Sequence, residues 1–509
     1  MKQQSILDPS DRFAARDADW RAGAVVYQVF VDRFAPSDDL GAKRHLYPAP
    51  KRLRAWDEVP AKGHFVEEAG VWSHEIDFWG GDLASVRANL GHLEAVSADV
   101  LYLNPIHEAY TNHKYDAIDY LAVSPEYGTR EDLRALVADA HARGMKVMLD
   151  GVFNHVGRRH RHFDAAMRDP SSAYRSWFFI GSEYPNGYRG WADVANLPDL
   201  HVERDEVREH LWLGEASAVR SYLRDGVDGW RLDVASDLGP HFLRELTRCA
   251  HEEKPGSAVV GEIWNAPAGW EGVLDGILNM NARRMVLEFV RGHADGPATA
   301  ARFADMVDDA GIEFLLRCWT TLENHDTDRL AGLVPDAAAR RVAHLLQATL
   351  PGCPNLYFGQ EYGAPGEADP MNRAPMRWDL VHDGNAEWCF VRELYARRRR
   401  ERALAKGDVK FLRTRRLLAF LRTTDRVLET CMVVANMEDV EVEETFAVRD
   451  GRIMAGTDFR DLVAWDRGDA MQVNVQQGFV TLRMPPRSAR VLRVVPPRAG
   501  QHSPYKRMG

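Results

Sequence analysis

The stretch REDLRALVADAHARGMKVMLDG, residues 130–151, joins a helix pattern to a strand pattern. Its apolar positions 133, 136, 137 and 140 recur at the helical period, and Gly144 is a typical helix stop. The run KVML at 146–149 is short and apolar, as expected of a buried strand. We therefore predict a helix over 130–143 followed by a strand over 146–149, which is one unit of a parallel α/β fold.

The same alternation extends from about residue 25 to residue 400. Further strands are predicted at 25–30 (VVYQVF), 99–103 (DVLYL), 227–232 (VDGWRL), 258–261 (AVVG) and 355–358 (NLYF). Further helices are predicted near 82–96, 205–224, 240–253, 336–350 and 386–402. Such repeats are typical of a parallel barrel or a doubly wound sheet. No G-x-G-x-x-G motif opens a helix after the first strand, which favours the (β/α)8 TIM barrel.

Two regions depart from this alternation. The first is rich in loop residues and follows the third predicted strand, so we interpret it as an inserted domain B. The second alternates apolar and polar residues without helices, which indicates a C-terminal antiparallel β-sandwich. The predicted organisation is a barrel over 1–156 and 202–404, an insertion over 157–201, a sandwich over 405–497 and a disordered tail over 498–509.

Composition and charge exclude several classes of protein. The 509 residues include 65 basic and 75 acidic ones with mixed signs, which gives no electrostatic reason to bind nucleic acid or an anionic membrane. No stretch approaches the roughly 18 apolar residues of a spanning helix. The N-terminus lacks the apolar run of a secretory signal. The five scattered cysteines suit free thiols in a reducing compartment, so we expect a cytoplasmic protein and leave its oligomeric state open.

Acidic residues follow three of the barrel segments. Asp233 ends GWRLD, Glu262 lies in GEIW and Asp326 lies in LENHDT. In a parallel barrel, groups placed after the strands meet on one face, where catalytic residues are found. One aspartate after a strand is usually a helix cap. Three acidic groups on one rim, each beside an arginine, tryptophan or histidine, indicate an active site instead.

Glycoside hydrolysis is the chemistry that needs such a set. A retaining enzyme uses one carboxylate to attack the anomeric carbon and a second carboxyl, with a raised pKa, to protonate the leaving oxygen. Positions 233 and 262 are 29 apart, about one βα unit. We therefore assign Asp233 as nucleophile, held ionised by Arg231, and Glu262 as general acid/base. Asp326 would bind sugar hydroxyls and stabilise oxocarbenium charge.

Three further side chains complete the predicted site. Trp264 could supply an apolar surround for Glu262 and a face on which a sugar stacks. His155 and His325 could donate hydrogen bonds to the same sugar ring. Other tryptophans in predicted rim loops either pack or stack on sugars: Trp72, Trp79, Trp177 and Trp191.

At these residues the sequence resembles the α-amylase family, glycoside hydrolase family 13. The segments DGVFNH, GWRLDVASD, GEIW and ENHDT follow the order and spacing of its four signature regions. YQVFVDRF at 27–34 is similar to its first barrel strand, LPDL at 197–200 to its fifth region and PMRWD at 375–379 to the loop before its eighth helix. The resemblance implies a (β/α)8 barrel, a domain B after the third strand and a C-terminal β-sandwich.

The resemblance also implies roles for individual residues. Asp233, Glu262 and Asp326 correspond to nucleophile, acid/base and transition-state stabiliser. Arg231, His155 and His325 correspond to the subsite that holds the reacting sugar. Tyr115 in NHKYD corresponds to the tyrosine that stacks on that sugar.

Within the family, GGDL at 80–83, NHKYDAIDY at 112–120 and GWRLDVA at 229–235 resemble the neopullulanase, cyclomaltodextrinase and maltogenic amylase group. This implies an α-glucan oligosaccharide substrate cleaved at α-1,4 bonds, with α-1,6 cleavage and transglycosylation left open. An exo-acting α-glucosidase or a 4-α-glucanotransferase of the same family is the alternative. A non-catalytic glycan-binding homologue would lack the nucleophile or the acid, and both are present.

We predict no metal site and no required cofactor. Ser236 and Asp237 replace the Lys-His pair that follows the nucleophile in typical α-amylases, which removes part of their calcium arrangement. Asn154 and Asp199 are expected to make structural hydrogen bonds. A calcium site formed by Asp38, Asp39 and Asp82 is an alternative. The cluster RRHRH at 158–162 is expected to be a solvated loop.

Overall fold

The computed structural model describes residues 9–462 and 471–495. Eight parallel strands close into a barrel, with β1 paired to both β6 and β14. In chain order the strands are β1 (Val26–Val29), β6 (Val100–Leu103), β9 (Lys146–Gly151), β10 (Gly229–Leu232), β11 (Ala258–Ile263), β12 (Gly276–Asn279), β13 (Trp319–Thr321) and β14 (Cys353–Tyr357). The predicted (β/α)8 barrel is confirmed.

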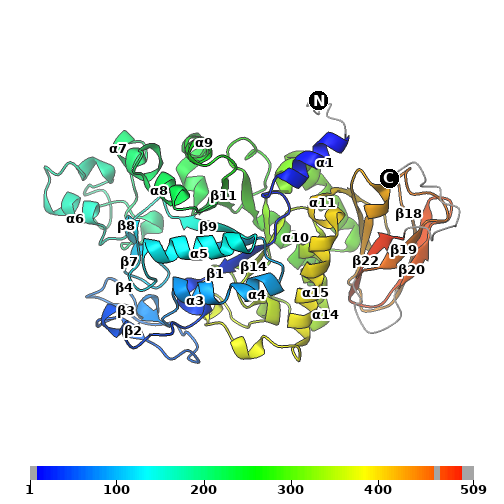
Figure 1. Cartoon of the computed structure of the whole chain (residues 1–509), viewed down its shortest axis with the longest axis horizontal. Helices are drawn as coiled ribbons and strands as arrows, with labels where there is room; N and C mark the ends of the chain where they lie inside the picture. Colours follow the sequence, from blue (N-terminus) through cyan, green and yellow to red (C-terminus); the bar gives the residue numbers. More distant parts are fainter. Residues whose placement is uncertain (1–8, 463–470, 496–509) are drawn as a thin grey trace.

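Helices surround this barrel (Figure 1). They are α3 (Leu83–Ala88), α4 (Leu90–Ala95), α5 (Arg130–Ala142), α8 (Ala218–Arg224), α9 (Ala235–Glu253), α10 (Met280–Val290), α11 (Gly296–Ala310), α14 (Ala337–Thr349) and α15 (Ala386–Arg400). Helix α5 begins at Thr129, whose hydroxyl accepts from the Asp132 N–H while the Asp132 carboxylate accepts from the Thr129 N–H. It ends before Gly144, whose φ of 76° suits glycine. Its four predicted apolar positions are buried.

Several features of the barrel differ from the prediction. Helices α10 and α11 were not predicted, and the single helix predicted near 82–96 forms two helices, α3 and α4. Strands β12 and β13 were not predicted, because GILN and WTT are too short to show a period. The helix predicted over 205–224 is wrong as a single element. The chain forms α7 (Asp205–Arg208), then one π-helical turn, η5 (Glu209–Leu213), and begins α8 only after a new cap at Ser217.

Long connections cover the carboxyl ends of the first three barrel strands. The first contains two small sheets, β2 (Arg52–Leu53) with β5 (Asp77–Phe78) and β3 (Phe65–Val66) with β4 (Val71–Trp72). The second forms the hairpin β7 (His107–Ala109) and β8 (Ala117–Val123). The third contains α6 (Arg161–Arg168) and isolated bridges that include His155 with Asp199. These connections wall the space above the barrel.

The C-terminal region forms antiparallel sheets, as predicted. One sheet has the order β15 (Asp408–Phe411), β16 (Leu418–Thr423), β17 (Cys431–Asn436), β22 (Ser488–Val494), β19 (Asp458–Asp461) and β20 (Gln472–Asn474). The other pairs β18 (Val442–Ala447) with β21 (Phe479–Met484). In β17, Val433 and Ala435 pack in the barrel core, whereas Met432 and Val434 pack in a cluster shared with β18 and β21. The predicted tail over 498–509 lies outside the described residues.

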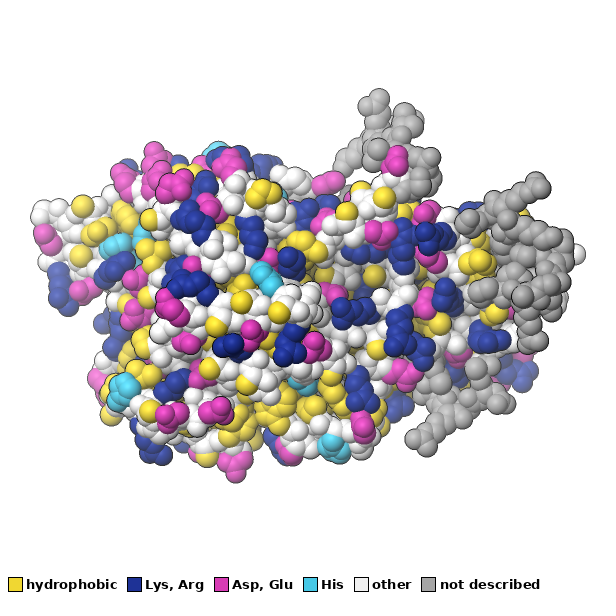
Figure 2. Space-filling model, in the orientation of Figure 1, with side chains coloured by type: hydrophobic (Ala, Val, Ile, Leu, Met, Phe, Trp, Pro, Cys, Tyr) yellow, Lys and Arg dark blue, Asp and Glu magenta, His cyan; other side chains and the backbone are white. Residues whose placement is uncertain are grey.

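Among the described residues, no helix is both long and apolar enough to cross a membrane. On the face shown in Figure 2, basic and acidic side chains alternate rather than gather in a patch of one sign. This agrees with the mixed charge of the sequence.

Candidate active site

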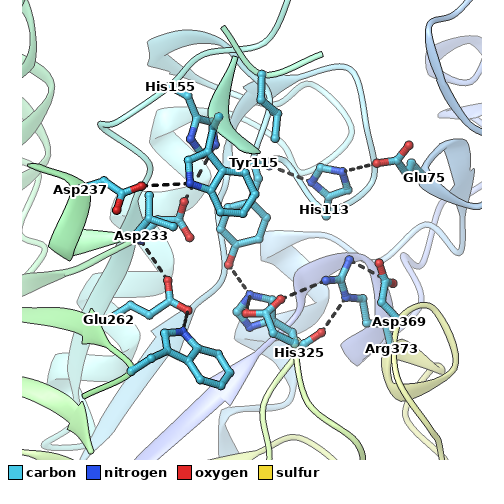
Figure 3. Close-up of a pocket in the computed structure, with 15 residues that line it drawn as sticks. Glu75, His113, Tyr115, His155, Asp233, Asp237, Glu262, His325, Asp369 and Arg373 are labelled. Atoms are coloured by element: carbon cyan, nitrogen blue, oxygen red, sulfur yellow. Dashed lines mark hydrogen bonds and ion pairs between the residues drawn. The ribbon is translucent and has the colours of Figure 1, made fainter. Parts of the chain in front are cut away.

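A cavity of about 520 Å³ opens at the carboxyl ends of the barrel strands. Its lining includes Glu75, His113, Tyr115, His155, Trp191, Asp233, Asp237, Glu262, Trp264, His325, Asp326, Asp369 and Arg373 (Figure 3). Asp233 follows β10 directly, Glu262 is the fifth residue of β11, and His325 and Asp326 follow β13. Functional groups from separate strands therefore meet on the face where barrel enzymes place their chemistry.

The guanidinium of Arg231 joins three carboxylates of three neighbouring strands. Its Nη1 lies 2.8 Å from Asp150 Oδ1 and 3.2 Å from Asp233 Oδ1, and its Nη2 lies 3.0 Å from Glu262 Oε2. Arg231 and Asp233 are two positions apart, so both side chains leave β10 on the barrel side. The arginine is fully buried. One cation thus compensates three acids in a low-dielectric site, where an unpaired charge would be costly.

Strained backbone aligns Glu262. Val234 has φ 38° and ψ 45°, a left-handed conformation that is unfavourable for a β-branched residue. In this conformation its N–H donates to Glu262 Oε2 at 2.9 Å. Such strain costs on the order of 1–3 kcal/mol and persists only where the surroundings hold it.

Glu262 is also bound from the mouth of the cavity. Trp264 Nε1 donates to Glu262 Oε1 at 3.0 Å, while the indole remains 56% exposed. A sugar could stack on the exposed ring while the ring edge positions the carboxyl group.

The pKa of Asp233 is raised above its usual range. Burial is the main cause, and the charges of Glu262, Asp150 and Asp326 add to it, whereas Arg231 lowers the pKa. Arg231 contacts Asp233, as the sequence predicts. Its charge opposes the raised pKa without cancelling it.

Asp326 is held as an anion. Burial raises its pKa, but His325 and Arg373 outweigh that effect and keep the pKa below the usual range. His325 Nε2 lies 2.9 Å from Asp326 Oδ2, and Arg373 Nη2 lies 3.2 Å from Oδ1. The side-chain amides of Gln28 and Asn104 face His325 Nδ1 at 2.9 and 3.2 Å, which leaves the ring proton on Nε2, toward Asp326.

Tyr115 provides a flat wall. Its ring lies parallel to that of His325, with centroids 5.3 Å apart and planes 8° apart. Its hydroxyl donates to Asp150 Oδ2 at 2.9 Å and lies 2.6 Å from His325 Nε2. The ring is therefore held by stacking on one face and by hydrogen bonds at its hydroxyl.

His155 is neutral and has free ring nitrogens. Burial lowers its pKa to about 3. Its Nε2 lies 3.9 Å from Asp233 Oδ2, and neither nitrogen has a hydrogen-bond partner within the described part of the chain. Buried polar atoms are normally paired, so these nitrogens are available to a bound hydroxyl group.

All eight predicted site residues come together. Seven line the cavity, and Arg231 lies beneath Asp233 and Glu262. Asp150 was missed, although it follows the strand pattern KVML and the rule that found Asp233 applies to it equally. Asp369 and Arg373, whose Oδ1 and Nη1 are 3.2 Å apart, were missed because they lie in the loop after β14, where no period indicates which side chains face the cavity.

The tryptophans of the rim loops divide between two roles. Trp191 and Trp264 line the cavity, and Trp191 Nε1 donates to Asp237 Oδ2 at 3.1 Å. Trp79 and Trp177 are buried packing residues.

Two of the carboxylates considered for calcium, Asp199 and Asp82, pair with protein cations. Asp199 Oδ2 lies 2.8 Å from Arg189 Nε, and Asn154 Nδ2 donates to Asp199 Oδ1 at 3.4 Å. Asp82 pairs with Lys43 and accepts from the Ser85 N–H at the start of α3. A calcium ion at either of these carboxylates would compete with the cation that is already there.

Comparisons with known proteins agree with this geometry. Residues 28–430 match the α-amylase catalytic domain. Neopullulanase 2 of Thermoactinomyces vulgaris is 34% identical over 442 residues, which cover 83% of this chain and 70% of that protein. A cyclomaltodextrinase of Bacillus sp is 32% identical over 449 residues, which cover 85% and 75%.

A solved structure of similar size also matches. It is the ligand-free cyclic α-maltosyl-(1→6)-maltose hydrolase of Arthrobacter globiformis, 28% identical with a TM-score of 0.76. The match covers 91% of this chain and 99% of that one.

Proposed function

The chain belongs to the α-amylase family of glycoside hydrolases, and we propose that it cleaves α-1,4-glucosidic bonds in maltooligosaccharides, cyclodextrins or related α-glucans with retention of configuration. The observation that carries this proposal is the arrangement around Arg231. Asp233 and Glu262 contact one buried guanidinium at the floor of the cavity, and Asp326 lies at the same cavity as a separate anion. A retaining enzyme requires two carboxyl groups in this close relation.

In the proposed first step, Asp233 attacks the anomeric carbon and forms a covalent glucosyl ester. The bond from that carbon to the leaving oxygen breaks, and Glu262 gives its proton to that oxygen. In the second step Glu262 takes a proton from water, the water oxygen attacks the anomeric carbon, and Asp233 leaves as a carboxylate. Asp326, an anion throughout, stabilises the positive charge that develops on the sugar.

This reaction needs Asp233 ionised and the proton on Glu262, whereas burial raises the pKa of Asp233 in the empty cavity. The Val234 N–H, the Trp264 N–H and Arg231 all face the oxygens of Glu262. We propose that a bound sugar draws Glu262 toward the leaving oxygen and away from Arg231. Arg231 would then pair chiefly with Asp233 and Asp150, which favours the ionised nucleophile.

The substrate is proposed to lie between aromatic faces, with Tyr115 at the reacting sugar and Trp264 at the mouth. The free nitrogens of His155 suit hydroxyl groups of a neutral sugar. We also propose a cytoplasmic location, which the five free thiols support.

The test is product analysis on maltose, maltotriose, β-cyclodextrin, pullulan and cyclic α-maltosyl-(1→6)-maltose. The last substrate is included because the match to its hydrolase spans nearly that whole chain. We expect release of reducing sugar that first appears as the α-anomer. Release of glucose alone from chain ends would favour the exo-acting alternative, and longer products would favour the glucanotransferase.

Substitutions at Glu262 and Asp233 test whether the activity depends on this site. Glu262→Gln should lower kcat by about 10²–10⁴-fold, because a general acid contributes about that much. Asp233→Asn should remove turnover. The controls are Asp139→Asn and Glu94→Gln, whose carboxylates are in exposed ion pairs. Full activity in either site variant, or no reducing sugar from any substrate, would contradict the proposal.

We further propose that catalysis needs no calcium. After chelation and dialysis, kcat should be the same with and without added Ca²⁺. The reason is that Arg189 already pairs with Asp199, and Lys43 already pairs with Asp82. Activity restored by Ca²⁺ alone would show a calcium site.

A further inference from the structure

Three histidines form a cluster away from the cavity. His160 caps the start of α6, His162 lies in its first turn, and His210 lies in the π-helical turn η5. Each ring offers one nitrogen, and these nitrogens all lie within 4.8 Å of one another. Helix α6 and helix α7, which leads into η5, lie at the same end of the molecule (Figure 1). The cluster corrects the expectation of a solvated loop at 158–162, because His160 and His162 are buried.

The three rings have unpaired nitrogens. His160 Nε2, His162 Nδ1 and His210 Nε2 are buried and have no hydrogen-bond partner among the described residues. A buried polar atom without a partner costs about 1–3 kcal/mol. Each ring has an unpaired nitrogen, and one nitrogen of each ring lies within 4.8 Å of the other two, which indicates a shared ligand that accepts lone pairs.

Aromatic side chains hold the rings in place. Tyr174 stacks on His162 at 3.9 Å, and Trp177 meets the same ring edge-on at 4.8 Å. Tyr120 packs near His160 and His210, with centroids 5.9 and 6.4 Å away. The three rings are therefore packed among aromatic side chains.

Neutral imidazole is the form that binds metal ions. Burial lowers the pKa of His162 to about 4, and it also lowers the pKa values of His160 and His210. All three rings are therefore neutral at pH 7. His160 Nδ1 accepts from the His162 N–H at 3.3 Å, so binding through Nε2 requires the proton to move to Nδ1 and gives up this long bond.

We propose that His160, His162 and His210 bind one Zn²⁺ ion. Imidazole is a preferred zinc ligand, and three protein ligands with water in the fourth position form a known tetrahedral arrangement. Zinc at about 2.0–2.1 Å from each nitrogen holds the nitrogens about 3.3 Å apart, so the rings need only close inward. The ion would tie α6 to η5 and so fix the connection that supplies Trp191 and Leu197 to the cavity.

The test uses the full-length protein, stripped with EDTA and dialysed. Bound zinc is measured after gel filtration, and Zn²⁺ affinity is measured by titration calorimetry. We expect one zinc per chain and a higher Tm when Zn²⁺ is present. Replacement by Co²⁺ should give the intense visible bands of a tetrahedral nitrogen site in the unmodified chain.

His210→Phe is the decisive variant, because phenylalanine keeps a ring among Trp177 and Tyr120 while removing the ligand. Zinc affinity should fall by about tenfold or more, and the rise in Tm should disappear. Retained hydrolysis of maltotriose would show that the variant is folded. His241→Ala, an exposed histidine on α9, is the control and should bind zinc as the unmodified chain does. No zinc on the unmodified protein, or equal affinity in His210→Phe, would overturn the proposal.

Discussion

At the scale of single residues, Arg231 determines how the site ionises. It faces Asp150, Asp233 and Glu262 within 3.2 Å, and its charge lowers the pKa of Asp233. The planar guanidinium reaches three carboxylates at once, which a lysine ammonium cannot do with the same geometry. Catalysis therefore depends on the shape of this cation as well as on its charge.

Arg231→Lys should move the acidic limb of the pH profile of kcat/KM to higher pH. The limb reports ionisation of Asp233, whose pKa burial raises and Arg231 lowers. Because the lysine ammonium cannot reach all three carboxylates, it lowers the pKa of Asp233 less than arginine does. We expect the acidic limb to move by about one pH unit and kcat/KM to fall. Thermal unfolding of the variant serves as the control for folding. A limb that stays in place, or moves to lower pH, would contradict this role.

The meeting of Asp233 and Glu262 at the cavity could be predicted because each lies at the end of a predicted strand, and the barrel brings strand ends together. Asp369 and Arg373 could not, because a loop after β14 has no period that indicates where its side chains point. The cluster of three histidines could not be predicted either, because His210 is far from His162 in the sequence and only the fold brings them together.

At the scale of elements, a buried ion pair supports the β7–β8 hairpin that presents Tyr115. Lys114 Nζ, fully buried, lies 3.2 Å from Glu126 Oε2, and Lys51 Nζ lies 2.6 Å from Oε1. Burial raises the pKa of Glu126, but both lysines outweigh it and lower the pKa to about 2. Removing one partner of such a pair leaves the other charge buried and unpaired.

Glu126→Gln should lower the free energy of unfolding by about 3–5 kcal/mol and reduce kcat, because Tyr115 adjoins Lys114 in the sequence. Asp139→Asn, which breaks the half-exposed pair with Arg87, should cost at most about 1 kcal/mol. Denaturant unfolding measures both. Equal small effects in the two variants would show that the buried pair does not hold the hairpin.

The ion pairs of Glu126 make a pH-dependent contribution to the free energy of unfolding. The pKa of Glu126 is lower in the folded chain than its usual 4.5, so the contribution is complete above about pH 4.5 and is lost as the pH falls toward 2. The difference in stability between the chain and Glu126→Gln should therefore narrow over that range.

The helix predicted over 205–224 shows why some elements escape prediction. VREHLWL keeps a helical apolar pattern, so the sequence does not reveal that Glu209–Leu213 forms a π-helical turn. Helix α5 was predicted well because its cap, its apolar period and its final glycine all agree.

At the scale of the whole molecule, the barrel and the C-terminal sheet share one core. Phe303 of α11 stacks on Phe411 at 5.9 Å, and Phe411 contacts Phe420 of β16 at 5.3 Å. Helix α14 also contacts β22 of the C-terminal sheet. The two regions should therefore unfold together, although the sequence shows them only as separate patterns.

Phe420→Ala should destabilise both regions by about 3–5 kcal/mol and leave a single transition in calorimetry, because it removes a fully buried ring from the shared core. Phe479→Ala, on a ring that is 50% exposed, is the matched control and should have a small effect. Two separate transitions, with only the later elements affected, would show that the regions are independent.

The central claim is that Asp233 forms a covalent bond with the sugar. The direct test is to incubate the protein with 5-fluoro-α-glucosyl fluoride, which slows release of the intermediate, and to map the modified residue by peptide mass spectrometry. We predict one fluoroglucosyl group on Asp233 and none on Asp233→Asn. A group on another residue, or turnover with inverted configuration and no adduct, would contradict it.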